Sequence, residues 1–359
     1  MSKERVLVAM SGGVDSSTAA FLLVKSGYEV IGINMKLWEE GGRYCGLNNA
    51  EDARRVAHKL SIPLYTLDLK KEFEKEVVEY FCQEYLNART PNPCIVCNEK
   101  IKFGVLLEKA KQLDASFVAT GHYARVEPNP FNQRYSLKRG RDTKKEQSYF
   151  LFPLSQQQLS RIIFPLSNLT KKEVRQIAAD IKLPVRDKKE SQEICFITQK
   201  DYNEFLKRVK PEFVRPGLIL DKSGKVVGKH SGIHLFTIGQ RKRLCGGRKK
   251  PAYVIQIKKE ENAIVIGERK DVYAQSMHVS KVNWVSIPEP KKPFYARVKI
   301  RYQHPEALAQ IYPLGGGKWR VDFLRPQWAI TPGQAAVFYE GDTLLGGGWI
   351  EKVIRQNIT

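Results

Sequence analysis

The fold is decided near the N-terminus by the stretch RVLVAMSGGVDS, residues 5 to 16. Arg5 to Met10 is a short apolar run, which predicts a buried strand, and Ser16 to Lys25 predicts a helix that Gly27 closes. A second strand is expected from Glu29 to Met35. A glycine-containing loop between a first strand and a first helix is typical of open α/β sheets, whose ligands bind beyond the carboxyl ends of the strands.

The alternation of strands and helices continues outward from this stretch through the first half of the chain. Thr170 and Glu173 form a capping box, which marks the start of a helix that runs to Ile181. Further helices are expected at Asn49 to Leu60, Lys71 to Leu86 and Ile101 to Leu113, and further strands at Leu64 to Leu69 and Ser116 to Thr120. The pattern predicts an α/β fold with a mostly parallel, Rossmann-like sheet that is covered by helices on both faces.

The second half of the chain is rich in β-branched and aromatic residues between glycine and lysine turns. Ser286 to Pro293 is rich in proline and is interpreted as a linker. Expected strands include the pair Tyr253 to Ile257 and Ala263 to Ile266, and then Tyr295 to Arg301, Leu308 to Tyr312, Trp319 to Phe323, Ala335 to Tyr339 and Thr343 to Ile350. We therefore expect a catalytic domain at 1–204, a central β-rich domain at 205–275 and a small β-barrel at 276–359.

The charge balance is strongly basic, with 60 Lys and Arg against 38 Asp and Glu, a formal net charge of +22 over 359 residues. Because 42% of the residues are hydrophobic, this excess lies on a folded surface, which usually meets a polyanion: nucleic acid or, less often, an anionic membrane. No window approaches 18 consecutive apolar residues, and no secretory pattern is present, so no membrane anchor is expected. The six cysteines are too sparse for a secreted disulfide scaffold, and we expect a cytoplasmic protein.

The loop from Ser11 to Ser16 has the composition of an anion site. Its two glycines allow backbone N–H groups to turn inward, and the following helix N-terminus adds positive partial charge. The loop lacks the Gly-Lys-Ser/Thr ending of a P-loop and the spacing of a dinucleotide loop. An ordinary glycine turn into a helix capped by Asp15 or Ser16 remains an alternative. Gly121, after a predicted strand, would let backbone approach a ligand, whereas Met35 taken alone predicts a core residue.

Cys94 and Cys97 form a CxxC between two predicted helices. Pro91 and Pro93 predict an ordered, non-helical loop that leads into a helix, whose N-terminus is expected to lower a thiol pKa. A structural zinc site needs four ligands, and the sequence offers no second CxxC or HxxxH. Cys195 lies in an apolar run and could equally be core or catalytic. No role is assigned to Cys45, Cys82 and Cys245.

Seven short strings occur in order along the chain, and together they resemble those of the tRNA-specific 2-thiouridylases, which thiolate the wobble uridine of certain tRNAs. The first string alone resembles the pyrophosphate-binding (PP) loop of the ATP pyrophosphatases. The resemblance covers essentially the whole chain. The strings are Ser11 to Ser16, Thr90 to Phe103, Gly121 to Tyr123, Lys145 to Leu151, Ser191 to Ile197, Thr237 to Arg241 and Thr331 to Gln334.

The resemblance implies the substrates and the residues that bind them. ATP adenylates the C2 oxygen of the uridine in tRNAs of the Lys, Glu and Gln type, the loop holds the pyrophosphate, and Asp15 holds or orients Mg²⁺. ATP would be bound by Ala9, Met10, Ser11, Gly12, Gly13, Val14, Asp15, Ser16, Met35 and Gly121. The target base would meet Asn92, Pro93 and Cys94, and tRNA would contact His122, Lys145, Glu146, Gln147, Arg301, Tyr302 and Gln334.

The resemblance also implies how sulfur arrives. Cys195 would receive a persulfide from a sulfur carrier protein or a cysteine desulfurase, and Cys97 would act as the nucleophile that releases the sulfur, leaving a transient Cys97–Cys195 disulfide. Many members of the family carry aspartate at the place of Cys94. Three thiols at 94, 97 and 195 could instead hold three irons of a [4Fe–4S] cluster, and this alternative stays open. A second departure lies near Arg243, where the family usually has glycine.

Other functions remain as alternatives to thiolation. Another PP-loop synthetase would need neither paired thiols nor a charge of +22, an RNA-binding module would tolerate loss of Asp15, and a CxxC oxidoreductase would not need ATP. Each basic run could be only a solvated face, but their spread favours a long tRNA track on a monomer. The runs are Arg134 to Lys145, Arg186 to Lys189, Lys207 to Arg215, Arg241 to Lys250 and Lys291 to Arg301.

Overall fold

The N-terminal region is built on a parallel five-stranded sheet. A computed structural model describes residues 3–40, 43–44, 47–189, 194–197, 202–211, 215–242, 244 and 251–355. The strand order is β5 (Leu64–Asp68), β2 (Glu29–Lys36), β1 (Arg5–Ala9), β6 (Phe117–Ala119) and β9 (Ile162–Ile163), with every neighbouring pair parallel. A small antiparallel pair, β3 (Glu39–Glu40) and β4 (Arg43–Tyr44), follows β2. The predicted α/β architecture is confirmed.

Strand β1 is buried on both faces, because its side chains alternate between two helical layers. Val6 and Val8 join the apolar cluster of α1 (Val14–Lys25), α2 (Leu47–Leu60) and α8 (Lys171–Asp180). Leu7 and Ala9 join a second cluster with α6 (Leu106–Gln112). This placement explains why residues 6 to 9 are uninterruptedly apolar and why the chain can only leave the sheet at the polar loop that follows.

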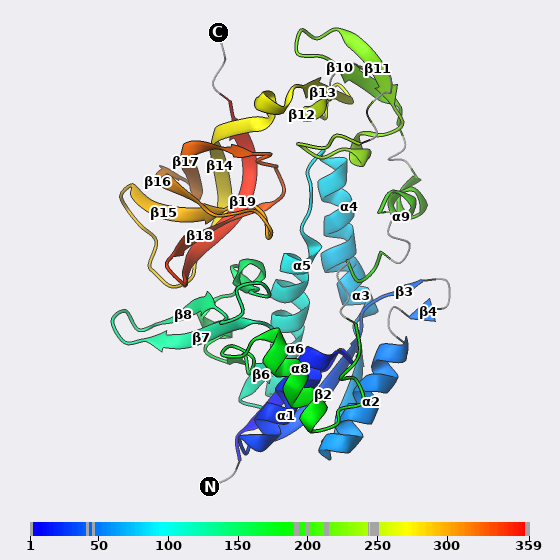
Figure 1. Ribbon diagram of the computed structural model, residues 1–359, viewed down its shortest axis with the longest axis vertical. Coiled ribbons are helices and arrows are strands. Elements are labelled where there is room, and N and C mark those ends of the chain that lie inside the picture. The colour runs from blue at the N-terminus through cyan, green and yellow to red at the C-terminus, as the bar shows by residue number, and fades with distance from the viewer. Residues whose placement is uncertain are drawn as a thin grey trace.

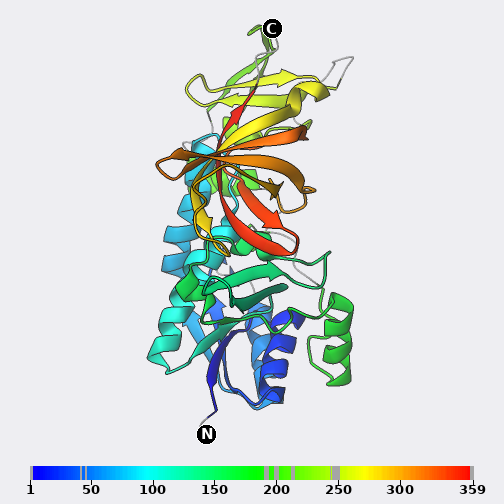
Figure 2. The same cartoon turned by 90° about the vertical axis from the view of Figure 1, so that its left-hand side faces the viewer.

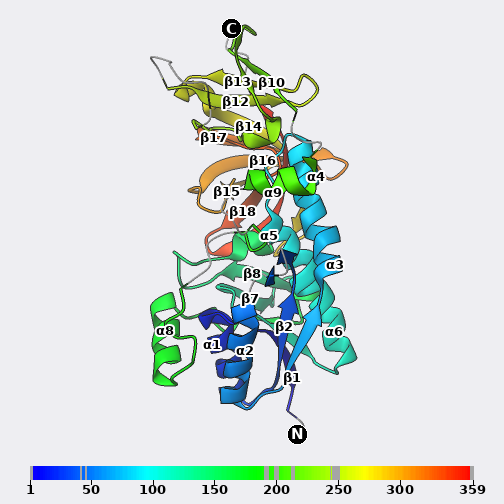
Figure 3. The ribbon, with the colours of Figure 1, turned by 90° about the vertical axis from the view of Figure 1, so that its right-hand side faces the viewer.

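Two long helical segments rise from the sheet toward the rest of the molecule (Figures 1 and 3). The first contains α3 (Lys70–Phe73), the π-helix η1 (Glu74–Val78) and α4 (Glu79–Leu86), and the second contains α5 (Pro93–Val96), the π-helix η2 (Cys97–Val105) and α6. The second helix therefore begins at Pro93, and the predicted non-helical loop around the CxxC is wrong. Proline is favoured at a first helical position, where it has no hydrogen bond to lose.

A hairpin that the sequence did not reveal connects the first region to the last. Strands β7 (Ala124–Asn129) and β8 (Arg134–Arg139) leave the N-terminal region, and β8 pairs with β19 (Thr343–Ile354). The remaining short elements of this region are η3 (Ser148–Leu151) and α7 (Gln156–Leu159). The N-terminal region is therefore joined to the barrel by backbone hydrogen bonds.

The C-terminal region is a closed barrel of six antiparallel strands, β14-β17-β16-β15-β18-β19, which the pairing of β14 with β19 closes. All five predicted strands are present, and β14 is an additional one. Ser286 to Pro293, the predicted linker, connects β14 to β15 within the barrel. The strands are β14 (Tyr273–Trp284), β15 (Phe294–Lys299), β16 (Ala307–Gly315), β17 (Lys318–Trp328), β18 (Ala335–Glu340) and β19.

The central region is a four-stranded sheet at the far end of the elongated molecule (Figures 1 and 2). Its order is β11 (Val226–His230), β10 (Gly217–Leu220), β13 (Ala263–Gly267) and β12 (Tyr253–Lys258), and the predicted pair at 253–266 is the antiparallel hairpin of β12 and β13. The region also contains α9 (Tyr202–Val209), η5 (Ile233–Leu235) and η6 (Arg269–Val272). None of the helices that the structure describes is both long and apolar enough to cross a membrane.

Candidate active site

The phosphate loop, residues 11 to 16, is shaped by its own serines and glycines. Gly13 is the N-cap of α1 and receives no side-chain cap, so Asp15 and Ser16 lie inside the helix and the ordinary capped turn is excluded. Ser11 N donates to Ser16 Oγ at 3.2 Å, and Ser16 Oγ donates to Gly13 O at 3.2 Å. The α1 N-terminus therefore has uncapped N–H groups, which suit an anion.

Glycine is required at two positions around this loop. Gly12 has a φ of +70°, and a Cβ there would lie 2.1 Å from the carbonyl oxygen of Asn49 in α2. A Cβ on Gly121 would lie 2.8 Å from the backbone of both Asp15 and Ser16. The demand for glycine at 121 therefore has a structural cause, which is close packing of the β6 terminus against the loop.

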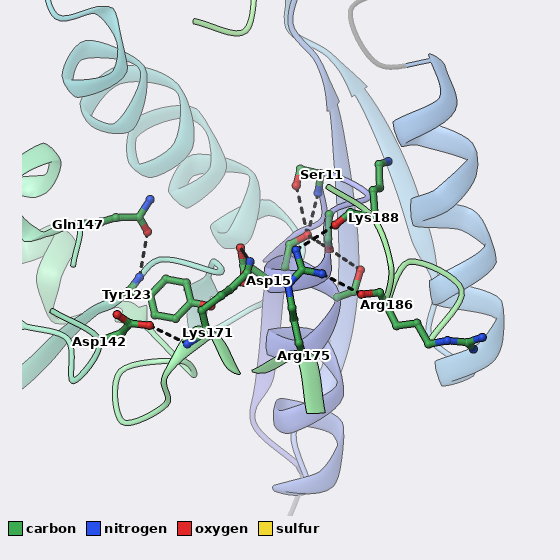
Figure 4. A network of polar contacts seen from close by, with 12 residues as sticks. Ser11, Asp15, Tyr123, Asp142, Gln147, Lys171, Arg175, Arg186 and Lys188 are labelled. Atoms are coloured by element: carbon green, nitrogen blue, oxygen red, sulfur yellow. Dashed lines mark hydrogen bonds and ion pairs between the residues drawn. The ribbon is translucent and has the colours of Figure 1, made fainter. Parts of the chain in front are cut away.

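Asp15 projects from the loop into a group of polar side chains (Figure 4). Its Oδ1 accepts a hydrogen bond of 2.7 Å from the Tyr123 hydroxyl, and Lys171 Nζ lies 2.7 Å from Oδ1 and 2.6 Å from Oδ2. Among the described residues no three His, Cys, Asp or Glu side chains gather to hold a metal ion. A single carboxylate beside a phosphate loop still fits Mg²⁺ that arrives with ATP, since Mg²⁺ in such sites binds one or two carboxylates, phosphates and water.

Three of the seven strings meet at this loop. Tyr123 donates from its hydroxyl to Asp15 and from its backbone to Gln147 Oε1 at 3.0 Å, and Gln147 N donates to Tyr123 O at 3.0 Å. We call residues 11–16, 121–123 and 145–151 the phosphate cluster. Glu146 is buried within it and accepts from Ser148 N, whereas Lys145 and Gln147 are half-buried.

His122 lies inside the phosphate cluster and is buried. Its Nδ1 is 2.7 Å from Thr120 Oγ1, and its ring packs near Phe103 and Phe164, with ring centroids 5.9 Å away in both cases. Burial lowers the pKa of His122 well below its usual value, so the imidazole is neutral at pH 7. A contact between His122 and tRNA stays a prediction.

Met35 lies near the end of β2 and is half-buried. It packs against both the cluster of α6 and the cluster of the CxxC helix. Its core role is therefore confirmed, and its contact with adenine stays a prediction.

The two thiols of the CxxC differ in exposure. Cys94 in α5 is exposed, whereas Cys97, the first residue of η2, is buried. Burial raises the pKa of the Cys97 thiol to about 11, and desolvation also raises the pKa of Cys94, while the charge of Lys102 opposes both shifts. The expected lowering of the pKa by a helix N-terminus is wrong for this arrangement, because desolvation outweighs it.

Cys195 is exposed and directly precedes Phe196, which packs in the same apolar cluster as Cys97. Phe196 contacts the rings of Phe73 and Phe81 at centroid distances of 5.7 and 5.2 Å. Packing of Phe196 thereby anchors the segment that contains Cys195 beside the CxxC helix. Cys82 is buried in α4, whereas Cys45, Cys245, Arg243 and residues 191–193 lie outside the described residues.

Three further strings meet at Thr90, just before the CxxC. Thr90 N donates to Pro332 O at 2.9 Å, and Thr90 Oγ1 lies 3.1 Å from Thr237 Oγ1. Gln334 Nε2 donates to the carbonyl oxygens of Thr90 and Pro91 at 3.0 and 3.1 Å. We call residues 90–103, 194–197, 237–241 and 331–334 the thiol junction. It brings all three regions of the chain to the loop that enters the CxxC helix.

The other predicted tRNA residues also make internal contacts. Arg301 donates to Ile238 O at 3.4 Å, Ala329 O at 3.2 Å and the Thr331 hydroxyl. Tyr302 packs against Phe150 with a centroid distance of 4.5 Å. Asn92 is half-buried and Pro93 is buried beside Cys94. Contacts of these residues with tRNA or its base remain predictions.

Sequence reasoning gave no role to four residues of the site, although Lys102 and Tyr123 lie in two of the seven strings. The four are Lys102, Tyr123, Lys171 and Lys188. The capping box located the start of α8, but nothing in the sequence connects Lys171 to Asp15, which lies 156 positions earlier. Lys188 Nζ reaches Gly12 O at 3.0 Å and was foreseen only as part of a basic run. The Lys171–Asp15 pair arises from packing of α8 against α1, and Lys188 lies beyond α8 against the loop and α2. Local sequence patterns carry no signal for either arrangement.

Three family models match consecutive parts of the chain. One described as a tRNA methyl transferase HUP domain matches residues 4–199, a tRNA methyl transferase PRC-barrel domain matches 203–268, and an aminomethyltransferase beta-barrel domain matches 274–350. The chain is also similar to proteins named tRNA-specific 2-thiouridylase MnmA. That of Halothermothrix orenii is 48% identical over 97% of this chain and 99% of its own, and that of Moorella thermoacetica is 48% identical over 97% and 100%.

Proposed function

The chain belongs to the tRNA-specific 2-thiouridylase family, and from that premise we propose that it is a sulfurtransferase that converts a wobble uridine of tRNA to 2-thiouridine at the expense of ATP. The observation that carries the proposal is the pairing of an uncapped phosphate loop with a cysteine helix in one region of the chain. The link between them is direct, since Asn98 Nδ2 in the thiol junction donates to Phe150 O in the phosphate cluster at 3.2 Å.

The family models and the named relatives suggest different reactions, and the site favours thiolation. Methyl transfer requires an electrophilic methyl donor and uses neither a triphosphate nor a pair of thiols. An uncapped helix N-terminus with a carboxylate beside it suits the phosphates of MgATP. A nucleophilic cysteine suits sulfur transfer to an activated carbonyl carbon.

Activation of the uridine is the first step. The C2 carbonyl lies between two ring nitrogens, is a poor electrophile and has no good leaving group. Its oxygen attacks the α-phosphorus of ATP, pyrophosphate departs into the loop, and the C2 carbon now carries AMP as a leaving group. A wobble base suits this chemistry, because only an unstacked uridine exposes its C2 oxygen.

Sulfur delivery uses two of the three thiols of the thiol junction, those of Cys97 and Cys195. Cys195 receives a sulfane sulfur from a carrier protein or a desulfurase, and the Cys97 thiolate attacks the Cys195 sulfur, so that a Cys97–Cys195 disulfide forms and hydrosulfide is released. Hydrosulfide adds to C2, AMP leaves, and loss of a proton gives the thiocarbonyl. A dithiol reductant then returns two electrons to the disulfide.

The cluster alternative has less support. Among the described residues Cys94, Cys97 and Cys195 do not form a three-ligand group for a metal ion. The described residues therefore support the relay more than the cluster, which stays the alternative. Cys94, which is exposed beside Asn92 and Pro93, instead fits a contact with the target base.

The surface charge fits tRNA as the substrate. A net charge of +22 on a chain with three regions supports a long phosphate-binding track. We propose a cytoplasmic monomer with the division 1–204, 205–275 and 276–359, which acts on tRNAs of the Lys, Glu and Gln type. The matched spans adjoin near 200 and 270, which supports this division.

The test is reconstitution with MgATP, a persulfide donor and tRNA, followed by mass spectrometry of the nucleosides. Formation of 2-thiouridine with one AMP per product is expected, and Cys97→Ser and Cys195→Ser should each abolish it. Cys82→Ala, a change of a buried cysteine outside the relay, should leave the reaction intact. Retained thiolation in either serine variant would contradict the relay, and iron with acid-labile sulfide that is lost in Cys94→Ser would favour the cluster.

A further inference from the structure

Lys171 is the first residue of α8, and its ammonium lies against the carboxylate of Asp15 in the phosphate loop (Figure 4). Nζ is 2.7 Å from Oδ1 and 2.6 Å from Oδ2, so both oxygens share it. The side chain of Lys171 is only 12% exposed, and that of Asp15 is 30% exposed. The pair is therefore partly withdrawn from water, and it joins α8 to the loop that is expected to hold phosphates.

A second lysine touches the loop in a different way. Lys188 Nζ lies 3.0 Å from Gly12 O, 2.6 Å from Asn49 Oδ1 and 2.6 Å from Asp52 Oδ2. Asn49 and Asp52 belong to α2, so this ammonium ties the loop to a neighbouring helix and is neutralised by a carboxylate outside the loop. Lys171, in contrast, neutralises the carboxylate of the loop itself.

The arrival of MgATP would change the partners of Lys171. Removal of one member of a partly buried ion pair is destabilising, so a second anion beside the ammonium would offset the loss of Asp15 to Mg²⁺. Asp15 fits Mg²⁺ that accompanies ATP, and the phosphates that the loop would hold are anions for which an ammonium is a strong hydrogen-bond donor. An exchange of partners therefore keeps both side chains compensated.

We propose that Lys171 is a pyrophosphate-binding residue, whose ammonium rests on Asp15 in the free enzyme and binds the β- and γ-phosphates once MgATP occupies the loop. The inference rests on the proposed ATP-dependent function and deepens it, because the same ammonium holds the pyrophosphate that leaves during adenylation. The Tyr123 hydroxyl, 2.7 Å from Asp15 Oδ1, keeps the carboxylate oriented during the exchange.

The experiment measures binding of magnesium pyrophosphate, MgATP and AMP by calorimetry, without tRNA or a sulfur donor. Lys171→Gln should weaken pyrophosphate and MgATP about tenfold to a hundredfold, the range for hydrogen bonds to a charged group, and leave AMP unchanged. Lys171→Arg should retain more affinity than the Gln variant, because it keeps the charge. Lys172→Gln, which changes an exposed lysine on the same turn, is the matched control and should bind like the wild type.

Selectivity between the ligands decides the outcome. Equal losses for pyrophosphate and AMP would show that Lys171 only shapes the loop, and a gain in pyrophosphate affinity would show that it only competes for Asp15; either result overturns the inference. Wild-type protein that binds neither ligand would overturn the proposed function itself. Binding by the wild type together with unchanged binding by Lys171→Gln would overturn only the role of Lys171.

Discussion

The phosphate cluster and the CxxC helix of the thiol junction both lie in the N-terminal region but differ in how ready they are for chemistry. The phosphate cluster has an uncapped helix N-terminus, a glycine loop locked by backbone contacts and charged groups in place. The thiol junction has a buried thiol, that of Cys97, whose pKa is raised to about 11. From this comparison we expect nucleotide to bind the enzyme without rearrangement of the loop, and we expect sulfur transfer to need a change at Cys97 when substrate binds.

The largest expected effect comes from a substitution that disrupts the phosphate cluster. Gly12→Ala places a Cβ 2.1 Å from Asn49 O at a φ of +70°, so the loop must move, and MgATP affinity should fall by more than about a hundredfold. Gly27→Ala is the matched control, since its φ is +89° and no described atom lies within 4 Å of the added Cβ. It should cost about 1 kcal/mol of unfolding free energy and leave nucleotide binding intact.

Calorimetry and thermal unfolding of the two variants separate these effects. Equal losses of nucleotide affinity in both variants would mean that left-handed strain, and not contact with α2, controls the loop, and the phosphate cluster would then be less rigidly formed than we infer.

The second prediction concerns the thiol junction and the pH dependence of the reactivity of Cys97. With a pKa of about 11, Cys97 is protonated at pH 8, so its alkylation should be roughly a hundredfold slower than that of an unperturbed thiol and should rise tenfold per pH unit until pH approaches 11. Lys102→Met removes the opposing charge and should slow alkylation a further several-fold, since the thiolate is then less stabilised.

Peptide mapping after timed alkylation identifies the cysteine that reacts, and the urea-unfolded protein supplies the unperturbed rate. Addition of MgATP and tRNA should move the profile to lower pH. A fast, pH-independent reaction of Cys97 in the free enzyme would show that the thiol junction is as ready for chemistry as the phosphate cluster. The inferred difference between the two sites would then be wrong.

Sequence patterns predicted the phosphate cluster better than the thiol junction. Three local signals predict the same strand, loop and helix at the N-terminus: the apolar run from Arg5 to Met10, the glycine turn after it and the start of the helix. At the CxxC the sequence placed a loop before a helix, whereas the helix begins at Pro93. It also could not weigh the effect of a helix N-terminus against burial, which depends on packing of Phe196 and other distant residues around Cys97. The hairpin of β7 and β8 was missed because Pro128 and charged residues obscure its pattern.

The third prediction tests how the thiol junction depends on the other regions. Gln334→Ala removes two hydrogen bonds to Thr90 and Pro91, so the CxxC helix should be held less firmly, and turnover of thiolation should fall about tenfold. Pyrophosphate affinity should not change, because the side-chain hydrogen bonds of Gln334 go to Thr90 and Pro91 in the thiol junction. A loss confined to the dissociation constant of tRNA would show instead that this side chain acts as a direct tRNA contact.

The smallest expected effect comes from the cap that positions Lys171. Thr170 is the N-cap of α8, and its side chain and that of Glu173 bond reciprocally to the helix N-terminus. Thr170→Ala should cost about 1 kcal/mol and weaken pyrophosphate binding by about fivefold, because the first turn that carries Lys171 loosens. Ser155→Ala, at the N-cap of α7 with the same capping box, should cost similar stability without changing pyrophosphate affinity. Alkylation of Cys97 should stay constant in both variants, since the cap lies on the side of the phosphate cluster. A changed alkylation rate in Thr170→Ala would mean that the phosphate cluster and the thiol junction are energetically coupled before any substrate binds. The two sites could then not be treated as independently prepared for their reactions.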